Sequence, residues 1–183
     1  MSAKVKIHTE GTPNPNALKF VTDCILLTAS TFNFPNKESA NDSPLAQKLF
    51  QIEAVKEVFI GRDFITVSKA PETQWEKIYD ELLKIINEHF ESGISVVNQT
   101  SAGASFKGSE IIEKIKEILD SQIRPAVAGD GGDVVFDSYE DGVLKLHLQG
   151  SCSHCPSSIM TLKVGIEQML KKQIPELKEV ISV

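Results

Sequence analysis

A polar, glycine-bearing segment from Gly93 to Gly108 constrains the fold most, because it lies between two strongly helical patterns. Small polar residues and glycine favour an irregular connection over a helix or a strand. The chain of 183 residues is long enough for a small domain on each side of this segment. We therefore predict a domain at 1–92, a flexible linker at 93–108 and a second domain at 109–183.

The N-terminal half begins with apolar and polar residues that alternate on both sides of a turn. Val5 and Ile7 precede the segment TPNPN at 12–16, and Leu18 and Phe20 resume the alternation. Proline and asparagine favour an extended turn, and alternation is typical of half-buried strands. This pattern predicts two strands joined by a stiff loop.

Further patterns in this half predict short helices and a hairpin. Ser43 followed by Pro44 is typical of a helix N-cap. The β-branched and aromatic residues from 55 to 68 surround a Gly-Arg-Asp turn and predict a hairpin. Thr73 is the expected N-cap of a helix whose apolar residues recur from Trp75 onward. The first domain is therefore predicted to be α+β.

The C-terminal half has a helix-strand-strand-helix-strand pattern. Ser109 is the expected N-cap of an amphipathic helix whose apolar stripe ends before Pro125. Asp-Gly-Gly-Asp at 130–133 predicts a turn into a strand, and Asp-Gly at 141–142 predicts a hairpin turn. A second helix and a strand at 180–183 follow. The whole chain is thus expected to hold two small α+β domains.

Composition restricts the partners and the compartment. The net charge of −6 comes without a cluster of Lys and Arg, so no nucleic-acid partner is expected. The sequence has no apolar run typical of a membrane span or a secretory leader. Three cysteines are too few for a disulfide framework, which favours a reducing compartment. We expect a cytoplasmic protein, with the bacterial cytosol favoured and a mature mitochondrial form also compatible.

The segment Cys152-Ser153-His154-Cys155-Pro156 is the strongest chemical signal in the chain. Pro156 suits the first position of a helix, which places Cys155 near the N-cap. Unpaired N–H groups and the helix dipole favour a thiolate there, so we predict lowered thiol pKa values. The isolated Cys24 has no nearby partner and is expected to be a small apolar residue in a strand.

Two thiolates permit three kinds of chemistry. A dithiol oxidoreductase would use Cys152 as nucleophile and Cys155 as resolving thiol, although its usual βαβ context is missing. A zinc site needs two more ligands, and His154 cannot easily reach the same ion from within so tight a loop. Two copies of the chain would supply four thiolates, enough for a shared zinc ion or a 4Fe-4S cluster. The residues alone leave these alternatives open.

Two segments of the C-terminal half together resemble the C-terminal domain of Nfu-type iron-sulfur proteins. They are AGDGGDV at 128–134 and GSCSHCPSS at 150–158. The segment TPNPNALKF at 12–20 also resembles the opening of the N-terminal domain of the same family, in the expected order.

The resemblance implies a function. Cys152 and Cys155 are expected to bind a labile 4Fe-4S cluster shared across a homodimer. The chain would act as a scaffold or carrier rather than as an enzyme, receiving the cluster from upstream assembly machinery and delivering it to apoprotein clients. By the same resemblance, the N-terminal domain is expected to help recognise those clients.

Overall fold

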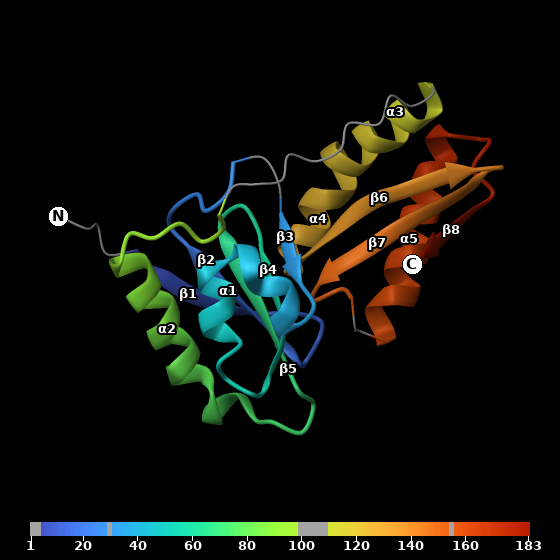
Figure 1. Ribbon diagram of the computed structural model, residues 1–183. Coiled ribbons are helices and arrows are strands. Elements are labelled where there is room, and N and C mark those ends of the chain that lie inside the picture. The colour runs from blue at the N-terminus through green and yellow to red at the C-terminus, as the bar shows by residue number, and fades with distance from the viewer. Residues whose placement is uncertain (1–4, 29–30, 99–109, 154–155) are drawn as a thin grey trace.

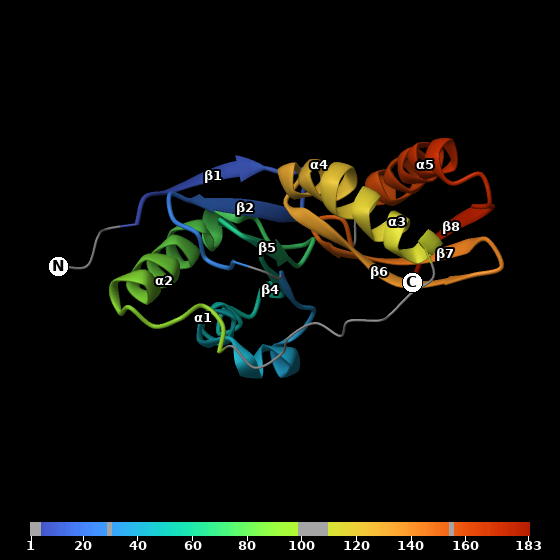
Figure 2. The same cartoon turned by 90° about the horizontal axis from the view of Figure 1, so that it is seen from above.

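Two domains, each a β-sheet with helices, make up the chain (Figure 1). The computed structural model describes residues 5–28, 31–98, 110–153 and 156–183, and of 156–162 it describes only the backbone. In each domain the helices pack on one face of the sheet, as the view from above makes clear (Figure 2). The predicted α+β class is confirmed. Within these described residues, no helix combines the length and the apolar character needed to cross a membrane.

The N-terminal sheet is antiparallel, with its strands in the order β1-β2-β5-β4-β3. The hairpin predicted at 55–68 is confirmed, because β4 pairs with β5, and the two strands predicted around the TPNPN turn are β1 and β2, which pair with each other. The edge strand β3 was not predicted, since three residues are too few to show an alternating pattern. The strands are β1 Ile7–Gly11, β2 Ala17–Thr22, β3 Phe32–Phe34, β4 Val55–Ile60 and β5 Phe64–Lys69.

The helices of this domain are α1 Pro44–Leu49 and α2 Tyr79–Glu91, with 3₁₀ turns at Lys37–Asp42 and Trp75–Lys77. The predicted cap of α1 is confirmed, because the Ser43 hydroxyl accepts a hydrogen bond from the N–H of Ala46 at 3.0 Å.

The predicted N-cap of α2 at Thr73 is wrong. The helix begins at Tyr79, and the 3₁₀ turn that contains Trp75 precedes it. The indole of Trp75 donates to the Pro15 carbonyl at 3.0 Å, and the Lys69 ammonium lies 5.3 Å from the ring centroid. These contacts with distant residues hold the first turn out of the helix, which the local spacing could not reveal.

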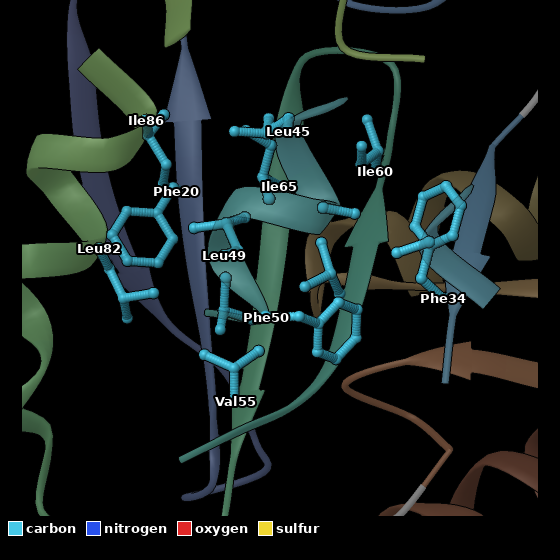
Figure 3. Close-up of a cluster of buried hydrophobic side chains, with 14 of the residues drawn as sticks. Phe20, Phe34, Leu45, Leu49, Phe50, Val55, Ile60, Ile65, Leu82 and Ile86 are labelled. Atoms are coloured by element: carbon cyan, nitrogen blue, oxygen red, sulfur yellow. The ribbon is translucent and has the colours of Figure 1, made fainter. Parts of the chain in front are cut away.

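Apolar side chains from the sheet, α1 and α2 form the N-terminal core (Figure 3). Phe20 and Ile65 from the sheet pack against Leu49 from α1 and Leu82 from α2. Val96 and Val97 are also buried in this core, although they lie inside the predicted linker. The N-terminal unit therefore packs through residue 97. Residues 99–108 of the predicted linker lie outside the described residues, so its flexibility stays a prediction.

The C-terminal domain has the predicted helix-strand-strand-helix-strand order. Its sheet has the order β6-β7-β8, in which β6 and β7 are antiparallel and β7 and β8 are parallel. The hairpin turn is confirmed by Asp141 and Gly142, whose φ angles are 52° and 86°. The elements are α3 Glu110–Ile118, a π-helix at Leu119–Ile123, α4 Arg124–Gly129, β6 Gly132–Glu140, β7 Val143–Gly150, α5 Pro156–Gln173 and β8 Glu179–Ser182.

The expectation that the apolar stripe ends before Pro125 is wrong, because the helical path continues beyond α3 and Val127 of α4 is buried in the same core. The π-helix follows α3 directly, and the N–H of Arg124 donates to the Leu119 carbonyl. Pro125 then lies in the first turn of α4, where a missing N–H costs little. The helical path therefore continues to Gly129. The predicted N-cap Ser109 lies outside the described residues.

Candidate functional site

The cysteine motif lies between the end of β7 at Gly150 and the start of α5 at Pro156, as the sequence predicts. The structure describes the first part of this connection, residues 151–153, which we call the cysteine loop. Cys155 and His154 lie outside the described residues. The predicted role of Cys155 as second ligand therefore stays a prediction.

Cys152 is buried, with 3% of its surface exposed, and belongs to the apolar core of the C-terminal domain. A Cβ atom at Gly132 would lie 2.7 Å from its sulfur, so the glycine at the start of β6 makes room for the side chain. A thiol packed in this way is screened from an external ligand. Binding a metal with Cys152 therefore requires the cysteine loop to change conformation.

Gly150 fixes the path of the chain into the cysteine loop. Its φ angle is +65°, which favours glycine, and a Cβ atom there would lie 2.7 Å from the Gly131 carbonyl oxygen. The N–H of Ser151 donates a hydrogen bond to the same Gly131 carbonyl at 3.2 Å. The Ser151 hydroxyl also donates to the Asp130 carbonyl. The turn before β6 and the cysteine loop are thus held side by side.

Three residues of the N-terminal domain reach these two segments. The Asn14 side chain donates to the Ser151 carbonyl at 3.1 Å, and the Ser153 hydroxyl donates to the Glu57 carboxylate at 2.8 Å. The Thr66 hydroxyl donates to the Gly131 carbonyl at 2.7 Å. The sequence did not point to these contacts, since the residues come from a turn, β4 and β5 and share no motif.

An ion pair also supports the start of β6. The Arg124 guanidinium donates to both carboxylate oxygens of Asp133, at 2.8 and 2.6 Å. Hydrogen bonding to Asp133 raises the pKa of Arg124 above its ordinary range. Asp133 is 3% exposed and also accepts from the Thr31 hydroxyl at 2.5 Å. These bonds fix the start of β6 beside the cysteine loop.

Among the residues that the structure describes, no group of three or more His, Cys, Asp and Glu side chains could hold a metal ion. Cys24 does not lie in a strand as expected, but in a bend after β2, where it is half-buried. Of the three cysteines, the structure describes Cys24 in the N-terminal domain and Cys152 in the C-terminal domain.

The comparisons with known proteins agree with the order of the two domains. Residues 7–93 match the family described as scaffold protein Nfu/NifU N terminal, and residues 115–181 match the NifU-like domain. The chain is 47% identical over 182 residues to a Drosophila sechellia protein named NFU1 iron-sulfur cluster scaffold homolog, mitochondrial. A protein of the same name from Drosophila persimilis is 46% identical.

The matches cover different shares of this chain and of the relatives. The matches to the two Drosophila proteins cover 97% of this chain but 64% of theirs. A solved structure, the solution NMR structure of a NifU-like protein from Saccharomyces cerevisiae, is 30% identical with a TM-score of 0.50. That match covers 55% of this chain and 91% of the yeast one. With both domains matched in order, the chain belongs to the Nfu-type iron-sulfur cluster scaffold family.

Proposed function

We propose that two copies of this chain bind one 4Fe-4S cluster between them, through Cys152 and Cys155 of each copy, and transfer it to apoproteins. The observation that carries the proposal is a Cys-x-x-Cys motif at a strand-to-helix junction within a NifU-like domain. The relatives are iron-sulfur cluster scaffolds by name, which supports an iron-sulfur cluster as the cargo. Thiolates are the usual ligands of such clusters.

The donor set supports a shared cluster. A 4Fe-4S cluster takes four thiolates, and Cys152 and Cys155 supply two from each chain. Closed two-fold symmetry is the simplest way to bring two identical pairs together. Cluster binding and dimerisation are then coupled, because losing the cluster removes the bonds that both copies share.

Transfer follows from ligand exchange. A cluster held at the surface by few protein ligands is open to attack by a client thiolate, which displaces Cys152 or Cys155 one bond at a time. This exchange requires no general acid or base, which fits a carrier that is not an enzyme. Solvent access also exposes the cluster to oxidation.

Anaerobic reconstitution with iron and sulfide tests the proposal. The wild-type chain is expected to take up about two irons and two sulfides per chain, with a broad absorption band near ~400 nm. Cys152→Ala and Cys155→Ala should each lose the band, whereas Cys24→Ala should keep it. Zinc at about half an ion per chain without colour would instead favour a zinc-stapled module. Turnover of a disulfide substrate would favour an oxidoreductase.

The N-terminal domain is proposed to recognise apoprotein clients. A groove of about 830 Å³ opens on this domain and includes Asn14 and Glu57, the two residues that bond to the cysteine loop. Lys37, Lys56 and Lys69 also line it. A client held there would stay tethered to the C-terminal domain, which raises the effective concentration of its cysteines at the cluster.

Reversing one charge in the groove tests client recognition. Lys56 is exposed, so Lys56→Glu should preserve the fold and cluster loading but slow transfer to a ferredoxin apoprotein. Lys84→Glu on the exposed side of α2 is the matched control. Equal transfer rates for both variants and the wild type would remove the groove from the proposal.

The compartment also stays a prediction. The Drosophila relatives are mitochondrial by name, and the sequence alone favoured a bacterial cytosol without excluding a mature mitochondrial form. Both compartments keep thiols reduced, as an exposed thiolate-bound cluster requires.

A further inference from the structure

We propose that the N-terminal domain acts as a latch on the cysteine loop, holding it with Cys152 buried, and that this contact and cluster binding exclude each other. The inference rests on the proposed function, in which Cys152 is a cluster ligand. It adds an interaction surface to that function, namely the face of the N-terminal sheet opposite α1 and α2. We call this surface the second sheet face and define it by Lys19, Glu57, Phe59, Phe64 and Thr66.

The second sheet face is buried although no helix of its own domain covers it. An antiparallel sheet commonly leaves one face to solvent, yet every residue of β5 is buried. Phe59 is 0% exposed and Thr66 1%, and neither belongs to the apolar cluster under α1 and α2. The two charged members, Lys19 and Glu57, are 8% and 3% exposed. The C-terminal domain therefore covers this face.

The cover consists of the segments that surround Cys152. A Cβ atom at Gly150 would lie 3.1 Å from the Phe59 ring, and one at Gly131 would lie 3.0 Å from the Thr66 hydroxyl. Glycine at these two positions lets the backbone of the C-terminal domain approach the sheet closely. The Lys19 ammonium also donates to the Gly129 carbonyl at 3.3 Å.

Hydrogen bonds from the N-terminal domain hold the residues on both sides of Cys152. Asn14 binds the carbonyl of Ser151, and Glu57 accepts from the hydroxyl of Ser153. The sulfur between them is packed in the C-terminal core. Turning that sulfur outward requires the backbone of the loop to rotate, which breaks one or both of these bonds.

The same contacts compete with a second copy of the chain. A shared cluster requires another cysteine loop to approach Cys152, but Asn14 and Glu57 of the N-terminal domain already bind the flanking residues Ser151 and Ser153. The latched conformation is thus unable to bind the cluster. Cluster binding is expected to shift the population toward an open conformation in which the domains separate at this contact.

The latch is tested by placing a larger side chain at the contact between the two domains. Thr66→Gln places a longer side chain against Gly131, where no space exists. Thr28→Gln, at an exposed position of the same domain, is the matched control. The readout is the rate at which iodoacetamide alkylates Cys152 in reduced, metal-free protein, followed by peptide mass spectrometry. Cys24 in the same sample serves as the internal reference.

The latch predicts that Thr66→Gln raises the alkylation rate of Cys152 about fivefold, as loss of one ordinary hydrogen bond would. The rate at Cys24 should stay unchanged, and Thr28→Gln should match the wild type. If Thr66→Gln fails to fold, as judged by circular dichroism, Asn14→Ala replaces it and should raise the rate at Cys152 in the same way. Equal rates at Cys152 in the folded variant and the wild type would overturn the latch.

A second measurement separates the latch from the proposed function. Folded Thr66→Gln should load iron and sulfide faster than the wild type under anaerobic conditions. Faster alkylation without any cluster in either protein would leave the latch standing and remove the proposed function. Loading at the same rate in both proteins, with faster alkylation, would overturn the mutual exclusion that the latch requires.

Discussion

At the scale of single residues, glycine decides how the cysteine loop is placed. Gly132 leaves space for the sulfur of Cys152, and Gly150 turns the chain with a φ of +65°. The sequence pointed to Cys152 and Cys155 through their spacing, and Gly150 is the first residue of the GSCSHCPSS segment. That Cys152 is buried could not be foreseen, because burial depends on the packing of β6 against the loop.

Gly150→Ala should destabilise the C-terminal domain by about 2–4 kcal/mol. The alanine would hold an unfavourable φ, and its Cβ would meet the Gly131 carbonyl at 2.7 Å. Gly165→Ala in α5 is the control, since that position is open and helical, and it should raise stability by up to about 1 kcal/mol. Urea unfolding compares the two. A Gly150 variant as stable as the wild type would refute the proposed strain.

At the scale of secondary-structure elements, local patterns predicted most of the fold. The Ser43 cap, the Asp-Gly turn and the paired strands follow from backbone preferences that act within a few residues. The start of α2 and the helix across Pro125 were mispredicted. In the first case a distant contact of Trp75 changed the local structure, and in the second a π-helix carried the chain past the proline.

The packing of α2 against the rest of its domain should depend on pH through His89. This side chain is 0% exposed, and burial, helped by the charge of Lys48, lowers its pKa below 6.5. Just below pH 6.5, His89 therefore binds a proton more readily in the unfolded chain than in the folded chain. Stability is expected to be full above about pH 6.5 and to fall as the pH drops below it.

Thermal unfolding at about pH 7.5 and about pH 5.5 measures this dependence. His89→Leu should reduce the difference in Tm between the two conditions, because it removes the buried titrating group. His8→Gln, at an exposed position, should leave the difference as in the wild type. The same difference in His89→Leu and wild-type protein would assign the pH dependence to other groups.

At the scale of the whole molecule, the two domains meet at the cysteine loop. The sequence predicted the domains and their order from periodicity and from the segment between them. It did not predict their contact, because Lys19 and Glu57 occupy strand positions that resemble an exposed polar face. Only the arrangement of the C-terminal segments around Thr66 and Phe59 reveals that this face is covered.

The most direct test of the account is native mass spectrometry of the anaerobically loaded chain. The account predicts a mass of two chains plus one 4Fe-4S cluster, and a monomer after the cluster is removed with a chelator. Cys152→Ala should give the monomer under both conditions. A single chain that carries a complete cluster would contradict the shared site.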